Sequence, residues 1–311
     1  MILLKYMPQL LKYCITYNNI IIFMKKYSLV KNKKFGFFKI FPTPSKKEIN
    51  YYYQKEFYNS KSKFFNNSSL EVQLEDKNFF NSRWENMYKN FCKFKKRNTI
   101  LDIGCGWCQS LIYFKNKGYD CYGFDPSKEA VEYGLKSKLN IKHAGIDEID
   151  IFGKKKFDII TLLNVLEHLR SPKEALSKIK NILNKNGLLV IDVPNDFNDF
   201  QLAARKLHKL PQWWVAPPRH LNYFSKDSLV KLLKSIGFKV LDAEASFPLE
   251  IFLLFGDNYV GNSVLGKECH KKRVMFEKNL LKYGRIGLLN KFYKSLADLG
   301  LGRTITIYAQ K

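Results

Sequence analysis

From residue 98 onward, short apolar segments alternate with amphipathic ones. Residues 99–103 and 157–164 are rich in leucine and isoleucine and end at polar or turn-forming residues, which is typical of buried strands. Residues 109–117 repeat apolar side chains at helical spacing, and the repeat stops at Gly118. Strands and helices that alternate in this way predict a parallel sheet with helices packed on both faces.

The same pattern defines the expected elements of the fold. It predicts strands over residues 99–103, 119–124, 140–144, 157–164, 188–193, 238–243 and 304–309. It predicts helices over residues 109–117, 126–138, 172–183 and 225–236. Three of these helices have serine or proline at their start, as helix N-termini often do. The fold class is therefore α/β, a doubly wound and mostly parallel seven-stranded sheet.

The first 97 residues lack this alternation and predict a leader followed by a helical extension. Ser45 and Glu48 have the spacing of a capping box that begins a helix through residue 57, and a second helix is expected over residues 70–94. Residues 1–27 hold apolar runs that Lys5 and Lys12 interrupt well short of the ~20 residues of a membrane span. We therefore expect no transmembrane segment, and no small-residue cleavage site marks a signal peptide.

Composition changes this picture little. The 53 Lys and Arg against 28 Asp and Glu give a net charge of +25, but the lysines are spread along the chain. No dense arginine stripe stands out, so we do not expect a nucleic-acid partner. Six scattered cysteines indicate free thiols and a cytoplasmic protein. Cys105 and Cys108 have a metal-ligand spacing, but no second pair accompanies them, and we expect no metal site.

The first predicted strand leads into the most informative segment. Gly104 and Gly106 allow a tight turn and a close approach of the backbone to a ligand. Asp102 adds negative charge beside that turn, which suits a cationic ammonium or sulfonium group. Asp125 ends the second strand about twenty residues beyond the glycines, where a carboxylate can accept two ribose hydroxyls. Gln109 stands where a dinucleotide fingerprint has its third glycine, which disfavours a nicotinamide enzyme.

The runs LDIGCG, YGFD, FDIITLLNVLEHLRSP and GLLVIDVPN together resemble the class I S-adenosylmethionine-dependent methyltransferases over about residues 98–245. This resemblance implies a methyltransferase domain over residues 98–311, with insertions at about 195–224 and 247–303. It also implies S-adenosylmethionine as the methyl donor. The implied contacts are Asp102, Gly104 and Gly106 with the methionine part, Asp125 with the ribose, Ile146 and Asp147 with the adenine, and Leu163 and Asn164 beside the donor.

Segments outside this core resemble a narrower group of methyltransferases, which is linked with bacterial surface-glycan and nucleotide-sugar pathways. They are FGFFKIFPTPSKKEINYYYQKEFY, WWVAPPRHLNYFSKDSL and GDNYVGNSVLGKECHKKR. The resemblance implies a sugar or nucleotide-sugar acceptor. Its hydroxyl needs a base, and histidine titrates near neutrality.

Two histidines follow predicted strands and are the candidate bases. His168 comes after the fourth strand, and His220 lies in the insertion after the fifth. Glu167 either orients His168 or caps a turn. Trp213, Trp214 and Arg219 belong to an aromatic insertion that suits a lid, although buried packing explains it equally well. The leading hypothesis is therefore methylation of a small molecule at oxygen or nitrogen. The alternatives are an RNA or protein methyltransferase and a non-catalytic donor-binding module.

Overall fold

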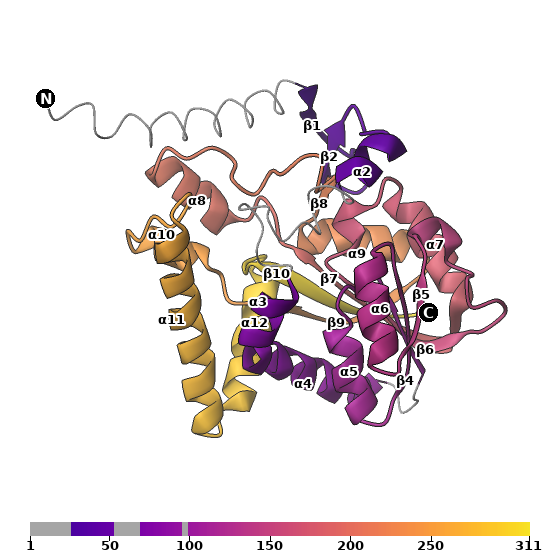
Figure 1. Cartoon of the computed structure of the whole chain (residues 1–311). Coiled ribbons are helices and arrows are strands. Elements are labelled where there is room, and N and C mark those ends of the chain that lie inside the picture. Colours follow the sequence, from indigo (N-terminus) through magenta and orange to yellow (C-terminus); the bar gives the residue numbers. More distant parts are fainter. Residues whose placement is uncertain (1–25, 53–68, 95–98) are drawn as a thin grey trace, which may run out of the picture.

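A computed structural model describes residues 26–52, 69–94 and 99–311 (Figure 1). Predictions for residues 1–25, including the apolar leader, lie outside the described residues. A seven-stranded sheet forms the centre of the fold, in the order β5-β4-β3-β6-β7-β10-β9. Its strands are β3 (Thr99–Ile103), β4 (Asp120–Asp125), β5 (Asn140–His143), β6 (Phe157–Leu163), β7 (Leu183–Pro194), β9 (Lys239–Ala245) and β10 (Thr304–Gln310).

The sheet is parallel except at one strand. Strands β3 to β7 pair in parallel, and β10 runs antiparallel to both β7 and β9. The chain builds outward from β3 to β5 and then returns to β6 on the other side of β3. Strand order therefore reverses at β3, and ligands of such sheets bind beyond the carboxyl ends of the strands at that point. The predicted α/β fold with a mostly parallel seven-stranded sheet is confirmed.

Alternation along each central strand creates a core on each face of the sheet. Ile100 packs with one cluster, which also holds Phe91, Leu111 and Val131 from the helices on that face. Leu101, the next residue, packs with the opposite cluster. Because successive side chains of a strand point to opposite faces, a strand with both faces covered is apolar nearly throughout.

Helices α4 (Lys77–Phe94), α5 (Gln109–Asn116) and α6 (Lys128–Lys136) cover one face, and α7 (Pro172–Ile182) and α9 (Lys226–Ser235) cover the other. Helix α9 begins as its sequence predicts, because the Ser225 hydroxyl accepts the Ser228 N–H. Helix α6 begins two residues later than predicted, since Ser127 and not Pro126 precedes its first turn, and the Ser127 hydroxyl accepts the Ala130 N–H at 3.2 Å. Such caps satisfy N–H groups that the first turn of a helix leaves open.

The N-terminal extension is not entirely helical, which corrects the prediction from sequence. Strands β1 (Ser28–Lys31) and β2 (Phe38–Phe41) form a hairpin that pairs with β8 (Asn222–Tyr223) from the insertion after β7. Phe35 and Phe37 are buried in the main core, so the apolar segment before residue 42 is tied down by packing. Helices α2 (Lys46–Tyr52) and α3 (Leu70–Glu75) follow, and Ser45 and Glu48 form the predicted capping box.

The segment between β7 and β10 contains four helices in addition to helix α9 and strand β9. They are α8 (Asp199–Leu207), α10 (Glu250–Leu254), α11 (Ser263–Lys282) and α12 (Ile286–Asp298). The long α11 and α12 lie against each other at one side of the molecule, at the opposite end from the hairpin β1–β2 (Figure 1). Within the described residues, no helix combines the length and apolar character that crossing a membrane requires.

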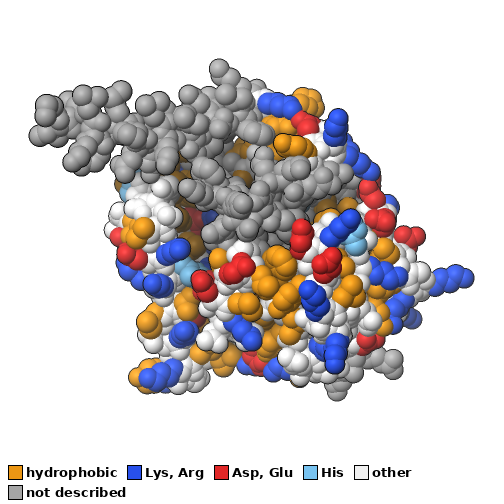
Figure 2. Space-filling view, in the orientation of Figure 1, with side chains coloured by type: hydrophobic (Ala, Val, Ile, Leu, Met, Phe, Trp, Pro, Cys, Tyr) orange, Lys and Arg blue, Asp and Glu red, His pale blue; other side chains and the backbone are white. Residues whose placement is uncertain are grey.

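On the face shown in Figure 2, Lys and Arg side chains are interspersed with acidic and apolar ones. No continuous basic band appears there. The excess of positive charge is therefore dispersed over this face, as the even distribution of lysine along the sequence predicts.

Candidate functional site

The loop after β3 is shaped by two glycines with left-handed backbone conformations. Gly104 has a φ of 69°, and a Cβ there would lie 2.7 Å from Val165 Cγ2. Gly106 has a φ of 47°, and a Cβ there would meet no described atom within 4 Å. A side chain is thus excluded at Gly104 by a neighbour, whereas the backbone of Gly106 faces open space.

Asp102 lies beneath this loop with both carboxylate oxygens bonded. Oδ1 accepts the Thr161 hydroxyl at 2.6 Å, and Oδ2 accepts the Ser110 hydroxyl at 2.8 Å. Burial raises the pKa of Asp102 to about 6, and the two hydroxyls act against that rise. The carboxylate is therefore mainly ionised at neutral pH and carries negative charge under the glycine loop.

Asp125, at the end of β4, faces the same loop from the neighbouring strand. Its Oδ2 accepts the Gly106 N–H and its Oδ1 accepts the Ser127 N–H, each at 2.8 Å. The side chain is nearly fully buried. These bonds fix the carboxylate at the carboxyl end of the sheet, as the sequence predicts. A carboxylate oxygen can accept more than one hydrogen bond, which is compatible with a ribose hydroxyl as a further donor.

The remaining predicted donor contacts surround this loop. Ile146 and Asp147 lie on a short 3-10 helix (Ile146–Glu148) after β5, and Leu163 and Asn164 follow β6. All four line the same cavity as Gly104 and Gly106. The Asp147 side chain is exposed and pairs with Lys46 Nζ at 2.6 Å. The Asp147 carboxylate therefore contacts the N-terminal extension.

A second group of polar side chains gathers where β6 ends and the insertion returns. His168 and Glu167 lie on a 3-10 helix (Leu166–His168), and His220 precedes β8. The two imidazole rings are 5.0 Å apart between centroids, and His168 Nε2 is 3.7 Å from Glu167 Oε1. The structure thus brings together the two histidines that the sequence singled out. The Nδ1–H of His168 donates to the carbonyl of Arg219 at 2.6 Å, across 51 residues of sequence.

Burial dominates the electrostatics of this group. It lowers the pKa of His168 to about 4 and holds the pKa of His220 well below its usual value. It raises the pKa of Glu167 well above the usual carboxyl value, and the nearby charges of Asp192 and Asp196 add to that rise. Both Glu167 oxygens and His220 Nδ1 lack a hydrogen-bond partner among the described residues. Such atoms are costly to bury and are uncommon in folded proteins.

Sequence reasoning did not assign a role to two further acids in this region. Asp192 lies near the carboxyl end of β7, Asp196 follows that strand, and both are buried. Asp192 accepts hydrogen bonds from Arg83 at 2.8 Å and Thr306 at 2.6 Å, and burial raises the pKa of Asp196 to about 7. Their place at the carboxyl end of a parallel strand was a usable signal. No local signal marks Arg83, which comes from the extension.

The aromatic insertion packs partly inward. Trp214 and Tyr223 are buried in a small cluster with residues of the β1–β2 hairpin, and Trp213 packs against it. Trp213, Trp214 and Arg219 also line the cavity. The two tryptophans therefore pack against the hairpin, and all three residues line the cavity. The lid role stays a prediction.

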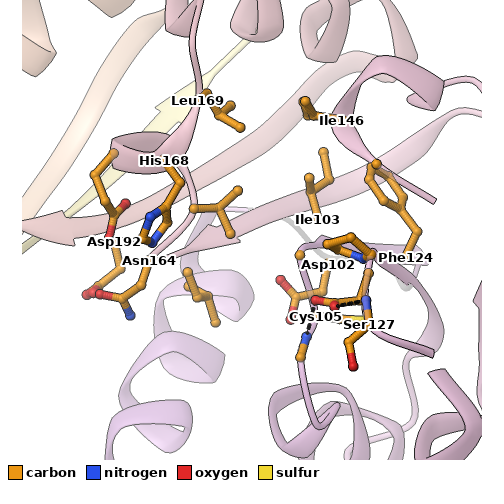
Figure 3. A pocket seen from close by; sticks show the side chains of 18 of the residues that line it. Asp102, Ile103, Cys105, Phe124, Ser127, Ile146, Asn164, His168, Leu169 and Asp192 are labelled. Atoms are coloured by element: carbon orange, nitrogen blue, oxygen red, sulfur yellow. Dashed lines mark hydrogen bonds and ion pairs between the residues drawn. The ribbon is translucent and has the colours of Figure 1, made fainter. Parts of the chain in front are cut away.

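One cavity of about 2200 Å³ joins the two groups. In Figure 3, Asp102, Cys105 and Ser127 lie on one side of the pocket, and His168, Asn164 and Asp192 lie on the other. The glycine loop fits a donor with a cationic, amino-acid-like end, because Gly106 faces open space above an ionised carboxylate. The volume exceeds the roughly 300–1000 Å³ of a site for one drug-sized ligand. It is therefore large enough for two substrates.

A family model described as a methyltransferase domain matches residues 84–243, just over half of the chain. The matched segment includes the glycine loop, Asp125 and the 3-10 helix with Glu167 and His168. The chain belongs to this methyltransferase family. Together with the sheet order, this makes the domain a class I S-adenosylmethionine-dependent methyltransferase.

Curated relatives with diverse names are similar to parts of the chain. A Papaver bracteatum protein named "Probable (S)-tetrahydroprotoberberine N-methyltransferase 2" is 28% identical over 46% of this chain and 42% of its own length. A tRNA U34 carboxymethyltransferase of Haemophilus ducreyi is 29% identical over 50% of each chain. The chain thus spans about half the length of the curated relatives it matches.

Solved structures share the fold at low sequence identity. A methyltransferase from Archaeoglobus fulgidus superposes with a TM-score of 0.51 and 19% identity, covering 78% of this chain and 100% of that one. The plantazolicin methyltransferase BpumL, solved with a monoazolic desmethylPZN analog and SAH, also has a TM-score of 0.51. It is 17% identical, with 85% of this chain and 93% of that one covered. At these identities the likeness concerns the fold alone.

Proposed function

We propose that this chain transfers a methyl group to a hydroxyl or amine of a small molecule, with a sugar or nucleotide sugar as acceptor. The observation that carries the proposal is the single cavity, which runs from the glycine loop to Glu167, His168 and His220. Methyl transfer requires an acceptor atom in line with the methyl group and little else. A site with a preformed donor end and a buried polar acceptor end meets that requirement.

At the donor end, we assign the residues that the sequence singled out. S-adenosylmethionine, when bound, supplies an electrophilic methyl group on a positively charged sulfur. The negative charge of Asp102 attracts that cationic end, and the backbone of Gly106 lies open beside it. The proposed donor contacts are Asp102, Gly104 and Gly106 for the methionine part, Asp125 for the ribose, Ile146 and Asp147 for the adenine, and Leu163 and Asn164 beside the sulfonium.

At the acceptor end, we assign His168 and His220 to the acceptor group. The new bond joins the acceptor atom to the methyl carbon, while the carbon–sulfur bond breaks and its electron pair stays on sulfur. An acceptor hydroxyl must also lose its proton, and the two histidines lie where they can assist that loss. Buried carboxylates such as Asp196, together with the ring of Trp213, suit the hydroxyls and apolar face of a sugar.

We also propose how the chain is divided. Residues 98–311 form the donor-binding domain, with insertions at about 195–224 and 247–303 that face the acceptor. Residues 1–97 form an N-terminal extension, and its described part contributes to the wall of the cavity. Lys46, Gln73 and Arg83 from this extension line the cavity, which supports that role.

The test is an acceptor screen with the full chain. Purified protein is incubated with a methyl-labelled donor and a panel of nucleotide sugars, free glycans, small amines and RNA, and labelled products are identified by mass spectrometry. We expect label in a sugar-containing or amine acceptor. Donor binding by calorimetry without transfer to any small molecule contradicts the proposal.

RNA is a second candidate acceptor, and two observations favour it. The chain has a net charge of +25, and several curated relatives are named as tRNA-modifying enzymes. Binding to RNA carried by lysine contacts weakens steeply with salt because counterions are released. Transfer only to RNA, with such a salt dependence, replaces the small-molecule acceptor by RNA.

A further inference from the structure

We propose that Glu167, His168 and His220 bind a divalent first-row transition-metal ion, such as Mn²⁺, Co²⁺ or Zn²⁺, at the acceptor end of the cavity. Each residue offers one ligand atom, and these three atoms all lie within 4.8 Å of one another. Metal–ligand bonds of roughly 2.0–2.2 Å place neighbouring ligand atoms about 3–4 Å apart. The 3.7 Å between Glu167 Oε1 and His168 Nε2 fits that spacing.

Glu167 supplies the independent evidence that something binds here. Its side chain is 1% exposed, and neither carboxylate oxygen has a hydrogen-bond partner among the described residues. His220 Nδ1 is also buried without a partner in that part of the chain. Burial of a carboxylate is strongly unfavourable unless a cation or hydrogen bonds compensate for the lost water. A metal ion bound by these atoms compensates for the buried Glu167 carboxylate and for His220 Nδ1 together.

One of the three proposed ligands, His168, is already oriented by a hydrogen bond. The Nδ1–H of His168 donates to the Arg219 carbonyl at 2.6 Å, so in the neutral ring Nε2 is the nitrogen with the lone pair. Metal-bound histidines commonly donate their other N–H to a carbonyl or carboxylate in this way. Asp192 and Asp196 add negative charge near Glu167, and the Arg219 guanidinium opposes it. Arg219 and Arg303 also lie near His220.

The ligand chemistry selects the metal and leaves room for an acceptor. Two imidazoles and one carboxylate favour transition metals over Mg²⁺ and Ca²⁺, which prefer oxygen ligands. Three protein ligands leave coordination positions open to the cavity, as in catalytic rather than structural sites. An acceptor hydroxyl bound there has a lowered pKa and loses its proton to water more readily. This role rests on the proposed function and makes the histidines ligands, not bases. Metal binding itself does not rest on it.

The test uses the full chain, stripped with a chelator and titrated with Co²⁺ alone. Calorimetry gives the stoichiometry and Kd, and the visible absorption of Co²⁺ reports nitrogen and oxygen ligation. We expect one Co²⁺ per chain, and at least about tenfold weaker binding for both Glu167→Gln and His220→Ala. Circular dichroism and donor binding check the fold of each variant. If Glu167→Gln fails to fold, His220→Ala carries the test, because that side chain is only partly buried.

Two matched variants separate this site from adventitious binding. His270→Ala removes an imidazole that lies 3.1 Å from an Asp76 carboxylate oxygen, and Cys105→Ala removes a buried thiol from the C-x-x-C pair. Both should bind Co²⁺ as the unmodified chain does. The proposal is overturned if the unmodified chain binds no Co²⁺, if Glu167→Gln and His220→Ala bind it equally well, or if Cys105→Ala abolishes binding.

The metal proposal and the acceptor proposal fail separately. Co²⁺ binding that depends on His220 supports the metal site even if no sugar or amine is methylated. Transfer to a sugar that persists in chelator, together with absent Co²⁺ binding, refutes the metal site and leaves the acceptor assignment in place. No local pattern in the sequence predicts a metal site here, because the three ligands come from two segments about 50 residues apart.

Discussion

The two ends of the cavity differ in how their polar groups are satisfied. At the donor end, both oxygens of Asp102 and both oxygens of Asp125 accept hydrogen bonds from neighbouring groups. At the acceptor end, Glu167 and His220 have buried atoms without partners among the described residues. The aspartates of the proposed donor end are therefore paired within the protein, whereas the proposed acceptor end holds buried polar atoms that are not.

We infer from this difference that the donor end is preorganised and that the acceptor end gains its missing interactions when a ligand binds. A loop whose carboxylates are already held loses little freedom when the donor binds. Unpaired buried groups instead gain most when a cation or hydroxyl arrives, because their desolvation has already occurred. Substitutions at the two ends should therefore affect different steps of the reaction.

Substitution of His220 should affect the transfer step far more strongly than donor binding. His220→Ala should lower kcat for the identified acceptor by about 10²- to 10⁴-fold, because a group that assists loss of the acceptor's proton is removed. The Kd for S-adenosylmethionine should change less than about twofold, since His220 lies at the acceptor end. Single-turnover assays and calorimetry measure the two quantities.

His208→Gln is the matched control for this substitution. His208 contacts the Leu253 carbonyl at 2.7 Å and does not line the cavity, so its loss should leave kcat near the unmodified value. If His220→Ala weakens donor binding as strongly as it lowers kcat, the two ends are not independent.

A substitution in the glycine loop should instead weaken donor binding. Gly104→Ala forces a side chain into a left-handed conformation, at about 1–2 kcal/mol, and against Val165, at roughly 1–3 kcal/mol more. We expect donor affinity to fall by about 30-fold or more, measured by calorimetry. Val165→Ala in the same chain should restore part of that loss.

Gly118→Ala separates backbone strain from the loss of donor binding. Gly118 also has a positive φ, of 87°, but a Cβ there meets no described atom within 4 Å, and it does not line the cavity. This variant should lose stability without losing donor affinity. Equal donor affinity in Gly104→Ala and the unmodified chain contradicts the assigned role of the loop.

The acceptor end also depends on the extension, through one ion pair. Arg83→Met leaves the buried carboxylate of Asp192 without its cation, and we expect a loss of about 1–3 kcal/mol in the free energy of unfolding. Lys46→Ala breaks a pair whose two side chains are 67% and 68% exposed, so urea denaturation should detect no change. Equal losses in the two variants contradict the inference that burial decides the value of the pair.

These two pairs also show what the sequence predicts and what it does not. The strands of the large sheet and the helices α5, α6, α7 and α9 follow local periodicity and were predicted, whereas helices α8, α10, α11 and α12 of the insertions were not. The proposed donor contacts were located because they lie at or just after the ends of strands. The hairpin β1–β2 was not predicted, because its register depends on β8, about 180 residues away. Arg83 meets Asp192 across 109 residues of sequence, and no local pattern encodes that contact.

The acceptor end illustrates the same limit in its chemistry. His168 and His220 were identified from their positions after strands, but their separation and the burial of Glu167 arise only when the insertion returns to the sheet. A pattern along the chain locates residues that face the site. Whether a carboxylate there is paired depends on tertiary contacts.

The smallest predicted effect is a dependence of donor affinity on pH. The Asp102 pKa is raised to about 6, so its carboxylate loses its charge as pH falls below 6, and about a tenth remains ionised at pH 5. Donor binding that uses this charge should be about tenfold weaker at pH 5 than at pH 8. In Asp102→Asn the affinity should be lower at pH 8, and this part of the pH dependence should vanish. Calorimetric titrations of both proteins at the two pH values measure it. An unchanged pH dependence in Asp102→Asn means that the charge under the glycine loop does not contribute to donor binding, and the donor end then relies on its backbone alone.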